Sequence, residues 1–320
     1  MRQYIIRRLI QMIPVLFGVT IFIFLIFQFA PGDPISNITG PRVTAQQMND
    51  LREQAGLNKP KIVQFFIWVS KAVRGDLGES YYFKQPVGRV MNSYIWNSFY
   101  LSLISFLLSV LISIPIGVIS ATKQYSKFDS FFTVFALIGI SMPTLFFGLL
   151  LIKWFAVDIK IFPVSGMQTP GSKFTGLANM KDILYHMMLP LTVLTLSSVA
   201  SLMRYTRSSM LEVIRQDYIR TARAKGLKEK IVIYKHALRN ALIPVITIFG
   251  MSFASLFAGA IITEQIFAWP GIGPIQLLAV NNRDYNLLMG YNLLIAILTL
   301  LGNLIADVSY ALVDPRIRYK

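Results

Sequence analysis

The chain has 320 residues, of which 54% are hydrophobic and only 14% are charged, whereas about 25% of a typical soluble domain is charged. So little charge cannot cover a water-facing surface, which excludes an ordinary soluble domain and predicts a membrane protein. Lys and Arg number 31 against 15 Asp and Glu, a net charge of +16. In a membrane protein such a balance reflects cations that collect in the cytoplasmic loops. Because the sequence holds no Cys, disulfides and thiol catalysis are excluded.

Six stretches contain no Asp, Glu, Lys or Arg over about 20 residues, the length that a helix needs to cross a bilayer. They are residues 9–30, 99–121, 131–152, 184–203, 241–263 and 287–306. The first stretch is longer than the apolar core of a signal peptide, and no cleavage site of small residues follows it. We therefore predict a retained first span and an all-α, polytopic membrane helix bundle with six transmembrane helices.

The distribution of cations predicts the orientation of these spans. If the N-terminus is cytoplasmic, the cytoplasmic segments 1–8, 122–130, 204–240 and 307–320 hold 18 Lys and Arg in 68 residues. The segments on the other side hold 13 in 122 residues. The higher density inside favours a multi-pass membrane protein with both termini in the cytoplasm.

The predicted organisation has three parts. Residues 1–30 form an N-terminal tail and the first span, residues 31–98 an extracytoplasmic subdomain, and residues 99–320 a five-span core with the cytoplasmic loop 204–240. Within the second part, apolar residues recur with near-helical spacing from Lys61 to Lys71. They predict an amphipathic helix that either packs against the spans, which is the simpler role, or lies on the outer leaflet.

A second irregular segment, residues 264–286, joins the last two spans. Its centre reads Phe267-Ala268-Trp269-Pro270-Gly271-Ile272-Gly273, which holds too much Pro and Gly to be helical throughout. We expect an interfacial or re-entrant turn that is buried in protein, because irregular backbone cannot face lipid.

The loop 204–240 is the most informative segment. Asp217 is a favoured N-cap residue, and Gly226 is typical of the position just after a helix end, so the pattern predicts a short helix from Asp217 to Lys225. A second helix is expected from Lys228, with Ile231, Tyr234 or Lys235, and Leu238 on one face. Such a protrusion suits docking by another protein, although an ordinary basic hairpin has the same pattern. Nucleic-acid binding by this loop is disfavoured, because a loop that is tied to membrane spans at both ends is poorly placed to enter a groove of a nucleic acid.

At this loop the chain resembles a known family. The run Tyr218-Ile219-Arg220-Thr221-Ala222-Arg223-Ala224-Lys225-Gly226-Leu227, followed by His236-Ala237-Leu238-Arg239-Asn240-Ala241-Leu242-Ile243-Pro244, resembles the "EAA" loop of ATP-binding-cassette (ABC) importer permeases, in the version of the dipeptide/oligopeptide (and nickel) branch. Arg220-Thr221-Ala222 stands where the general motif has Glu-Ala-Ala, so the motif's acidic residue is not carried over. Its Gly is matched by Gly226.

The resemblance extends over essentially the whole chain in an ordered set of short motifs. They are Arg7-Arg8, Ala30-Pro31-Gly32-Asp33-Pro34, Gly75-Asp76-Leu77-Gly78, Phe162-Pro163-Val164-Ser165-Gly166, the 267–273 run, and Asp314-Pro315-Arg316-Ile317-Arg318-Tyr319. Each motif is weak alone, and the ordered set is specific.

The resemblance implies a type I ABC importer permease-like fold and a multi-pass subunit of the bacterial cytoplasmic (plasma) membrane. With a homologous second permease it would form the pathway for oligopeptides or dipeptides, which an extracytoplasmic binding protein delivers. Two nucleotide-binding ATPase subunits would bind ATP and Mg and drive transport. The residues implied to couple them to the spans are Asp217, Tyr218, Arg220, Thr221, Ala222, Arg223, Ala224, Lys225 and Gly226.

The absence of certain motifs agrees with ATP hydrolysis in separate subunits. It has no Gly-x-x-x-x-Gly-Lys-Ser/Thr phosphate loop, so we expect no enzyme activity and no cofactor in this chain. With only His186 and His236, no His-rich metal site is expected, and His186 is expected to be a satisfied structural imidazole. The residues that bind substrate are not indicated. Open alternatives are import of nickel or another small solute by the same architecture, a secondary transporter, and an intramembrane enzyme, for which no catalytic constellation is present.

Overall fold

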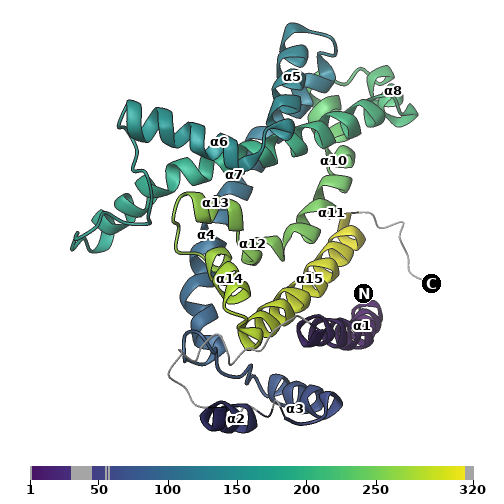
Figure 1. The fold of residues 1–320 in the computed structure, drawn as a ribbon. Coiled ribbons are helices and arrows are strands. Elements are labelled where there is room, and N and C mark those ends of the chain that lie inside the picture. The colour runs from purple at the N-terminus through teal and green to yellow at the C-terminus, as the bar shows by residue number, and fades with distance from the viewer. Residues whose placement is uncertain (1, 30–44, 55, 57, 314–320) are drawn as a thin grey trace. The chain divides into compact units, whose positions relative to one another are not determined.

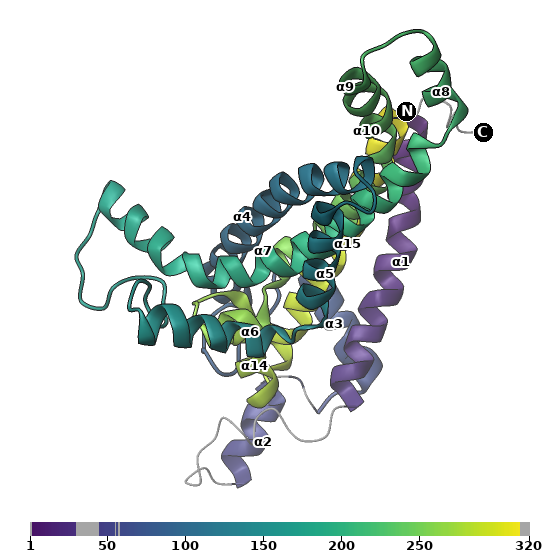
Figure 2. The same ribbon diagram turned by 90° about the horizontal axis from the view of Figure 1, so that it is seen from above.

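The computed structural model describes residues 2–29, 45–54, 56 and 58–313. Helices make up most of these residues, and their β-structure amounts to one isolated bridge between Glu79 and Pro86. The chain divides into two compact units: residues 1–98, 257–261 and 270–301 form unit 1, and residues 99–256, 262–269 and 302–320 form unit 2. Figures 1 and 2 show the helices of each unit in two views.

The helices follow one another along the chain as α1 (Arg2–Phe29), α2 (Ala45–Gln54), α3 (Lys61–Val73), α4 (Val87–Thr122), α5 (Lys127–Ser141), α6 (Thr144–Leu151), the π-helix η1 (Ile152–Asp158), α7 (Gly176–Ile214), α8 (Asp217–Ala224), α9 (Glu229–Ile231), the π-helix η2 (Val232–Ala237), α10 (Leu238–Ala241), α11 (Ile243–Ser252), α12 (Ser255–Ala258), α13 (Ile261–Ile266), α14 (Ile272–Asn281) and α15 (Tyr285–Val313).

The helices of the structure match the six predicted spans only in part. Among the described residues four helices, α1, α4, α7 and α15, are long and apolar enough to cross a membrane, and α5 with α6 and η1 makes a fifth if the pair counts as one span. That pair bends by 104°. The cause is Pro143, which lacks a backbone donor and holds Met142 in an extended conformation with ψ 121°.

The predicted span 241–263 is also broken. It consists of α11, α12 and the start of α13 rather than one helix. Gly259 has φ +75°, a left-handed conformation that ends a right-handed helix. A Cβ at this position would lie 2.9 Å from the backbone nitrogen of Gly273, so the break also lets two backbones approach closely.

In unit 1 the core joins the start of α4 to α14 and α15. Its buried side chains are Val87, Val90, Met91, Ile272, Ile275, Ala279, Leu287, Leu288 and Tyr291. Buried Asp284 precedes α15 and ties the 80–82 turn to it: its carboxylate accepts hydrogen bonds from the Ser80 hydroxyl, from the Tyr82 amide at 3.1 Å and from the Leu287 amide at 3.2 Å.

The segment between α13 and α14 is irregular, as the 267–273 sequence predicts. Side chains satisfy the part of its backbone in unit 1, where the Ile272 amide donates to the Ser98 hydroxyl at 2.8 Å and the Asn97 side-chain amide donates to the Pro270 carbonyl at 2.7 Å. Buried hydrogen bonds of this kind replace those of a regular helix.

The predicted helix at 61–71 is confirmed as α3. Phe65 and Trp68 are buried on one side of it, in a cluster with Ile23 and Phe24 of α1 and Met289 of α15. In both ribbon views α3 lies beside α1 (Figures 1 and 2).

In unit 2, α7 is the central helix. Ala200 and Met203 of α7 pack against Ala136 of α5, and Leu189 and Val193 pack against Leu151 and Phe267. Two motifs far apart in sequence, 162–166 and 267–273, also meet in this unit. The Gly166 amide donates a hydrogen bond to the Phe267 carbonyl at 2.8 Å.

α11 and α15 approach each other closely through small residues in unit 2. A Cβ built on Gly250 would lie 2.3 Å from the Cβ and 2.8 Å from the Cα of Ala306, and one built on Gly302 would lie 2.6 Å from the Gly250 carbonyl oxygen. These distances are below any normal contact, so each helix presents bare backbone to the other, as small-residue interfaces in membranes do.

We therefore expect Gly250→Ala to destabilise the protein, although alanine is the better helix former. The added methyl meets backbone that cannot move aside, and overpacking of this kind costs about 1–3 kcal/mol. The measurement is thermal unfolding of the purified protein in detergent. Gly18→Ala is the matched control, because a Cβ there meets nothing within 4 Å. Equal melting temperatures for the two variants would contradict the close approach.

Candidate functional site

The short helix predicted in the 204–240 loop is present as α8, Asp217–Ala224. It starts at Asp217, as predicted, but Gln216 rather than Asp217 is the N-cap, and Gln216 makes no side-chain capping bond. Asp217 instead lies in the first turn, where a carboxylate complements the helix dipole, and its side chain is 3.4 Å from the Arg220 guanidinium.

α8 is amphipathic and is held by two buried side chains, Ile219 and Ala222. They belong to a cluster that we call the α8 seat, which also contains Val118, Ala121, Met210, Val232, Ala237 and Ala241. The seat therefore joins α8 to the ends of α4 and α7 and to η2 and α10. Any force on α8 reaches these longer helices directly, because packed interiors are close to incompressible.

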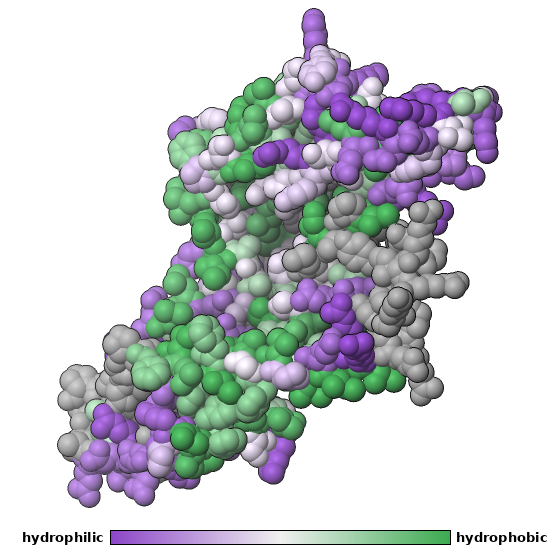
Figure 3. Space-filling model, turned by 90° about the vertical axis from the view of Figure 1, so that its right-hand side faces the viewer, coloured by the Kyte–Doolittle hydropathy of each residue, from purple (hydrophilic) through white to green (hydrophobic). Residues whose placement is uncertain are grey.

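The remaining α8 side chains point away from the seat. Tyr218, Arg220, Thr221, Arg223 and Ala224 are exposed, and so are Lys225 and Gly226 after the helix. Burial of part of the Tyr218 ring raises the pKa of its hydroxyl above the ordinary value. Figure 3 shows hydrophilic side chains over the upper end of the molecule, the height at which Figure 1 places α8.

The turn after α8 has the conformation that the sequence predicts. Gly226 has φ +76°, and its amide donates to the Arg223 carbonyl at 2.9 Å. The Arg223 guanidinium also spans the turn, with two hydrogen bonds of 2.7 and 3.1 Å to the Glu229 carboxylate. This pair holds the pKa of the Glu229 carboxyl below its usual range, so the bonds persist at neutral pH and are lost only as the pH falls through that lowered value.

The second predicted helix forms, but the predicted face is wrong. Ile231 and Tyr234 are exposed, whereas Val232, Ala237 and Ala241 are buried. The reason is the π-helix η2, in which hydrogen bonds join residues five apart rather than four. Buried side chains consequently recur at intervals of five and then four residues.

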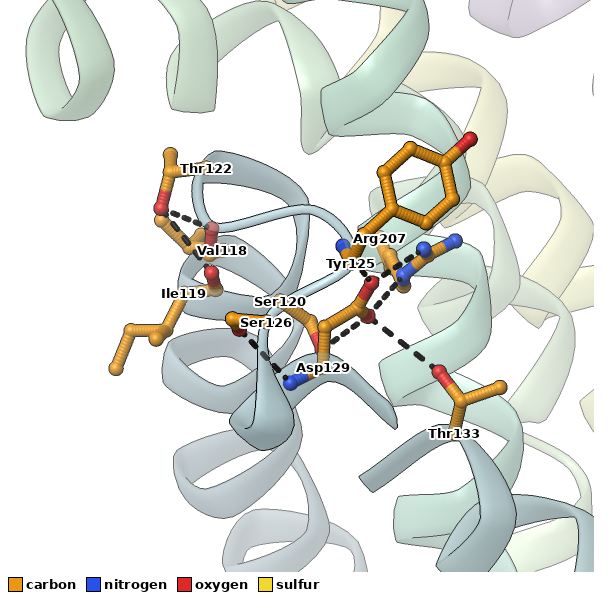
Figure 4. Close-up of polar contacts among 9 residues, drawn as sticks. All are labelled: Val118, Ile119, Ser120, Thr122, Tyr125, Ser126, Asp129, Thr133 and Arg207. Atoms are coloured by element: carbon orange, nitrogen blue, oxygen red, sulfur yellow. Dashed lines mark hydrogen bonds and ion pairs between the residues drawn. The ribbon is translucent and has the colours of Figure 1, made fainter. Parts of the chain in front are cut away.

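The structure adds a buried ion pair near the seat that the sequence analysis did not single out. Asp129 of α5 is 3% exposed, and Arg207 of α7 donates to both its carboxylate oxygens at 2.7 and 2.8 Å (Figure 4). The same carboxylate accepts from the Ser120 hydroxyl at 2.8 Å and the Tyr125 amide at 3.0 Å. We call this group, Ser120, Tyr125, Asp129 and Arg207, the Asp129 clamp. It fixes the ends of α4, α5 and α7 to one another.

A local signal for Asp129 was available. Ser126 caps α5 and accepts a hydrogen bond from the Asp129 amide at 3.2 Å, so the Ser-x-x-Asp pattern of a capped helix start is present. Its partner Arg207 lies 78 residues away, and no local pattern pairs the two.

His186 has the surroundings of a structural histidine. It is buried, with Nδ1 2.9 Å from the Asp182 carbonyl oxygen. The Asp182 carboxylate is satisfied in turn by the amide and hydroxyl of Thr169 at 2.8 and 2.7 Å. Across the described residues, no group of three or more His, Asp or Glu is arranged to hold a metal ion.

Unit 2 also contains a cavity of about 160 Å³ at the bend between α5 and α6. Its walls are almost entirely apolar, with Thr144 and Ser197 as the hydroxyl-bearing residues. The lining residues are Phe135, Ile138, Gly139, Met142, Thr144, Phe147, Val193, Leu196 and Ser197. Such a space suits a small apolar group and offers no charge to an ion.

Two motifs of the predicted set, Ala30-Pro31-Gly32-Asp33-Pro34 and the 314–319 tail, lie outside the described residues. Of the others, Arg7-Arg8 lies within α1, and the rest lie in turns or at helix ends. Gly78, for example, has φ +84°, and its amide donates to the Asp76 carboxylate at 2.9 Å.

Comparison with known proteins gives matches over the full length of the chain. The N-terminal model of binding-protein-dependent transport system membrane components matches residues 1–114, and the model of the binding-protein-dependent transport system inner membrane component matches residues 113–319. The oligopeptide transport system permease protein AppB of Bacillus subtilis (strain 168) is 45% identical over 320 residues, covering all of both chains.

One further relative and one solved structure are similar to this chain. The dipeptide transport system permease protein DppB of Alkalihalophilus pseudofirmus is 40% identical over 334 residues, again covering both chains completely. Among solved structures, an inward-facing MetNI methionine ABC transporter matches with a TM-score of 0.53 over 70% of this chain and 96% of that chain. At 16% identity this last match shows the fold alone: a multi-helix ABC importer permease. The chain thus belongs to the family of binding-protein-dependent transport system inner membrane components.

Proposed function

We propose that this chain is one permease subunit of an ATP-driven importer of oligopeptides or dipeptides. The observation that carries this proposal is the full-length similarity to an oligopeptide permease, at 45% identity. A homologous second permease would complete the pathway, an extracytoplasmic binding protein would deliver the peptide, and two ATPase subunits would bind and hydrolyse ATP.

In the proposed mechanism α8 and the Gly226 turn dock in the ATPase subunits. The exposed side chains of α8 supply the contact, and buried Ile219 and Ala222 fasten the helix to α4 and α7. ATP binding and hydrolysis favour different arrangements of the ATPase pair, and each arrangement would favour a different state of the spans. The Asp129 clamp would keep the ends of α4, α5 and α7 moving together when α8 is displaced.

Reconstitution of the importer in vesicles tests this function. Vesicles that contain both permeases, the ATPases and ATP should take up a labelled peptide mixture when the cognate binding protein is added, and vesicles that lack this chain should not. A parallel measurement with radioactive nickel separates the peptide branch from the nickel branch. Uptake of nickel without uptake of peptides would reject the proposed substrate class and keep the architecture.

The proposed topology places α8 and both termini in the cytoplasm, in agreement with the cation distribution. Single cysteines report on it cleanly, because the chain has none of its own. Gln85→Cys and Lys228→Cys both replace exposed side chains, whereas nearby Ser80 is buried and unsuitable. In intact cells a membrane-impermeant maleimide should label position 85 and not position 228, and lysis should expose 228. Labelling of both positions before lysis would overturn the orientation.

A further inference from the structure

α3 is too short to cross a bilayer, yet it is apolar on almost every side. Its 13 residues span roughly 20 Å at 1.5 Å per residue, against about 30 Å of hydrocarbon. Eight of them are Ile, Val, Phe or Trp, and of these only Phe65 and Trp68 are buried in the protein. A helix of this kind needs something to cover the rest of its apolar surface.

One side of α3 lies against the apolar length of α1 rather than beyond its end. The Phe65 ring is 5.3 Å from the Phe24 ring and 6.1 Å from the Phe17 ring, both in edge-to-face geometry. Phe17 lies 12 residues before Phe29, the end of α1, which is roughly 18 Å along the helix axis. Since α1 is a candidate membrane span from Ile5 to Phe29, this contact places α3 at the depth of the hydrocarbon layer.

Another side of α3 carries a stripe of exposed large apolar residues. The exposed fractions are 72% for Ile62, 59% for Phe66 and 83% for Val73. Spacings of four and seven residues put the three side chains on one face of a helix. Apolar side chains of α1 are exposed as well, among them Phe22 and Phe29 at 65% and 82%.

Cations mark the two ends of α3. Lys59 and Lys61 are exposed at its start, and Lys71 and Arg74 are exposed at its end. Long cationic side chains near the ends of an apolar helix reach out to phosphate groups while their stems remain among hydrocarbon. The charges therefore complement a lipid headgroup layer.

We propose that α3 is embedded in the bilayer leaflet that surrounds the Phe29 end of α1, with the Ile62, Phe66 and Val73 stripe against lipid acyl chains and the four cations at the level of the lipid phosphates. It would act as a lateral anchor that fixes the depth of the 61–86 segment. Only the name of that leaflet, the outer one, depends on the topology proposed above.

Spin labels on single cysteines test this placement in the assembled importer, reconstituted in lipid nanodiscs. Phe66→Cys puts a label in the stripe, and Lys71→Cys is the matched control on the polar side of the same helix. The collision rates of each label with oxygen, which concentrates in lipid, and with a water-soluble nickel chelate are compared. The ratio of oxygen to nickel accessibility at position 66 is expected to exceed that at position 71 by at least about threefold.

Two results would overturn the proposal. A label at position 66 that collides with the nickel chelate as often as the label at 71 would place the stripe in water. A label at 66 that neither reagent reaches would show that a protein surface covers the stripe. Because Phe66 is exposed, its replacement should leave folding intact, and transport by each labelled variant is measured to verify this. The readout does not depend on the identity of the substrate, so the peptide assignment can fail while this placement holds.

Discussion

An importer with Gly226→Val is expected to reach the membrane in normal amounts and to lose most of its transport. Gly226 has φ +76°, where a side chain costs about 1–2 kcal/mol and a β-branched one more. No atom lies within 4 Å of a Cβ there, so the cost arises from the backbone alone. Because 1.4 kcal/mol corresponds to a factor of about ten, we expect uptake and ligand-stimulated ATP hydrolysis to fall about tenfold or more.

Two control variants isolate the conformation as the cause. Gly226→Asn adds a side chain of similar size that tolerates left-handed backbone, and it should retain most of the transport. Gly88→Val adds the same side chain at a glycine with equally open surroundings and no positive φ. If Gly226→Val transports at the wild-type rate, the α8 turn is not the coupling element.

Asp129→Asn is expected to have the largest effect on stability. The variant leaves the Arg207 guanidinium, which is only 24% exposed, without its carboxylate partner. Removing one member of a buried ion pair costs about 3 kcal/mol, because the other charge remains desolvated. For a chain of this size such a loss lowers the melting temperature by about 4 °C or more, measured as thermal unfolding of the purified importer.

The double variant Asp129→Asn/Arg207→Gln tests the pairing itself. With both charges gone, no ion is left buried alone, and part of the lost stability should return. Thr133→Val is the matched single control, since its hydroxyl makes only a marginal 3.4 Å bond to the same carboxylate. An Asp129→Asn melting temperature equal to that of the Thr133 variant would show that the clamp contributes nothing.

The sequence could predict the features that depend on local patterns of residues. The apolar periodicity at 61–71 predicted α3, and a helix-forming run followed by Gly226 predicted α8 and its left-handed turn. The position of α8 could be predicted for the same reason, because its ends are set by residues within the segment.

Other features depend on geometry that the sequence does not display. A lack of charge in 131–152 and 241–263 predicted two spans, but it cannot report that Pro143 and Gly259 break the helices. The face of the second helix was wrong because η2 changes the spacing of buried residues, and no residue type marks a π-helix. The Asp129–Arg207 pair was missed because its members meet only when α5 packs on α7.

In the proposed docking mode, one face of α8 recognises the ATPase subunit and the other face attaches the helix to the spans. Ile219 and Ala222 contact only the protein's own seat, whereas Arg220, Thr221 and Ala224 face outward. A chimaera in which only Arg220, Thr221 and Ala224 are replaced by the corresponding residues of a related permease should therefore keep its own fold. It should bind the ATPase subunits of that related system. A chimaera that also exchanges Ile219 and Ala222 needs the residues of the α8 seat from the same related permease. In this proposal α8 can be exchanged between related permeases, and the exchanged residues are defined by the two faces of the helix rather than by its two ends.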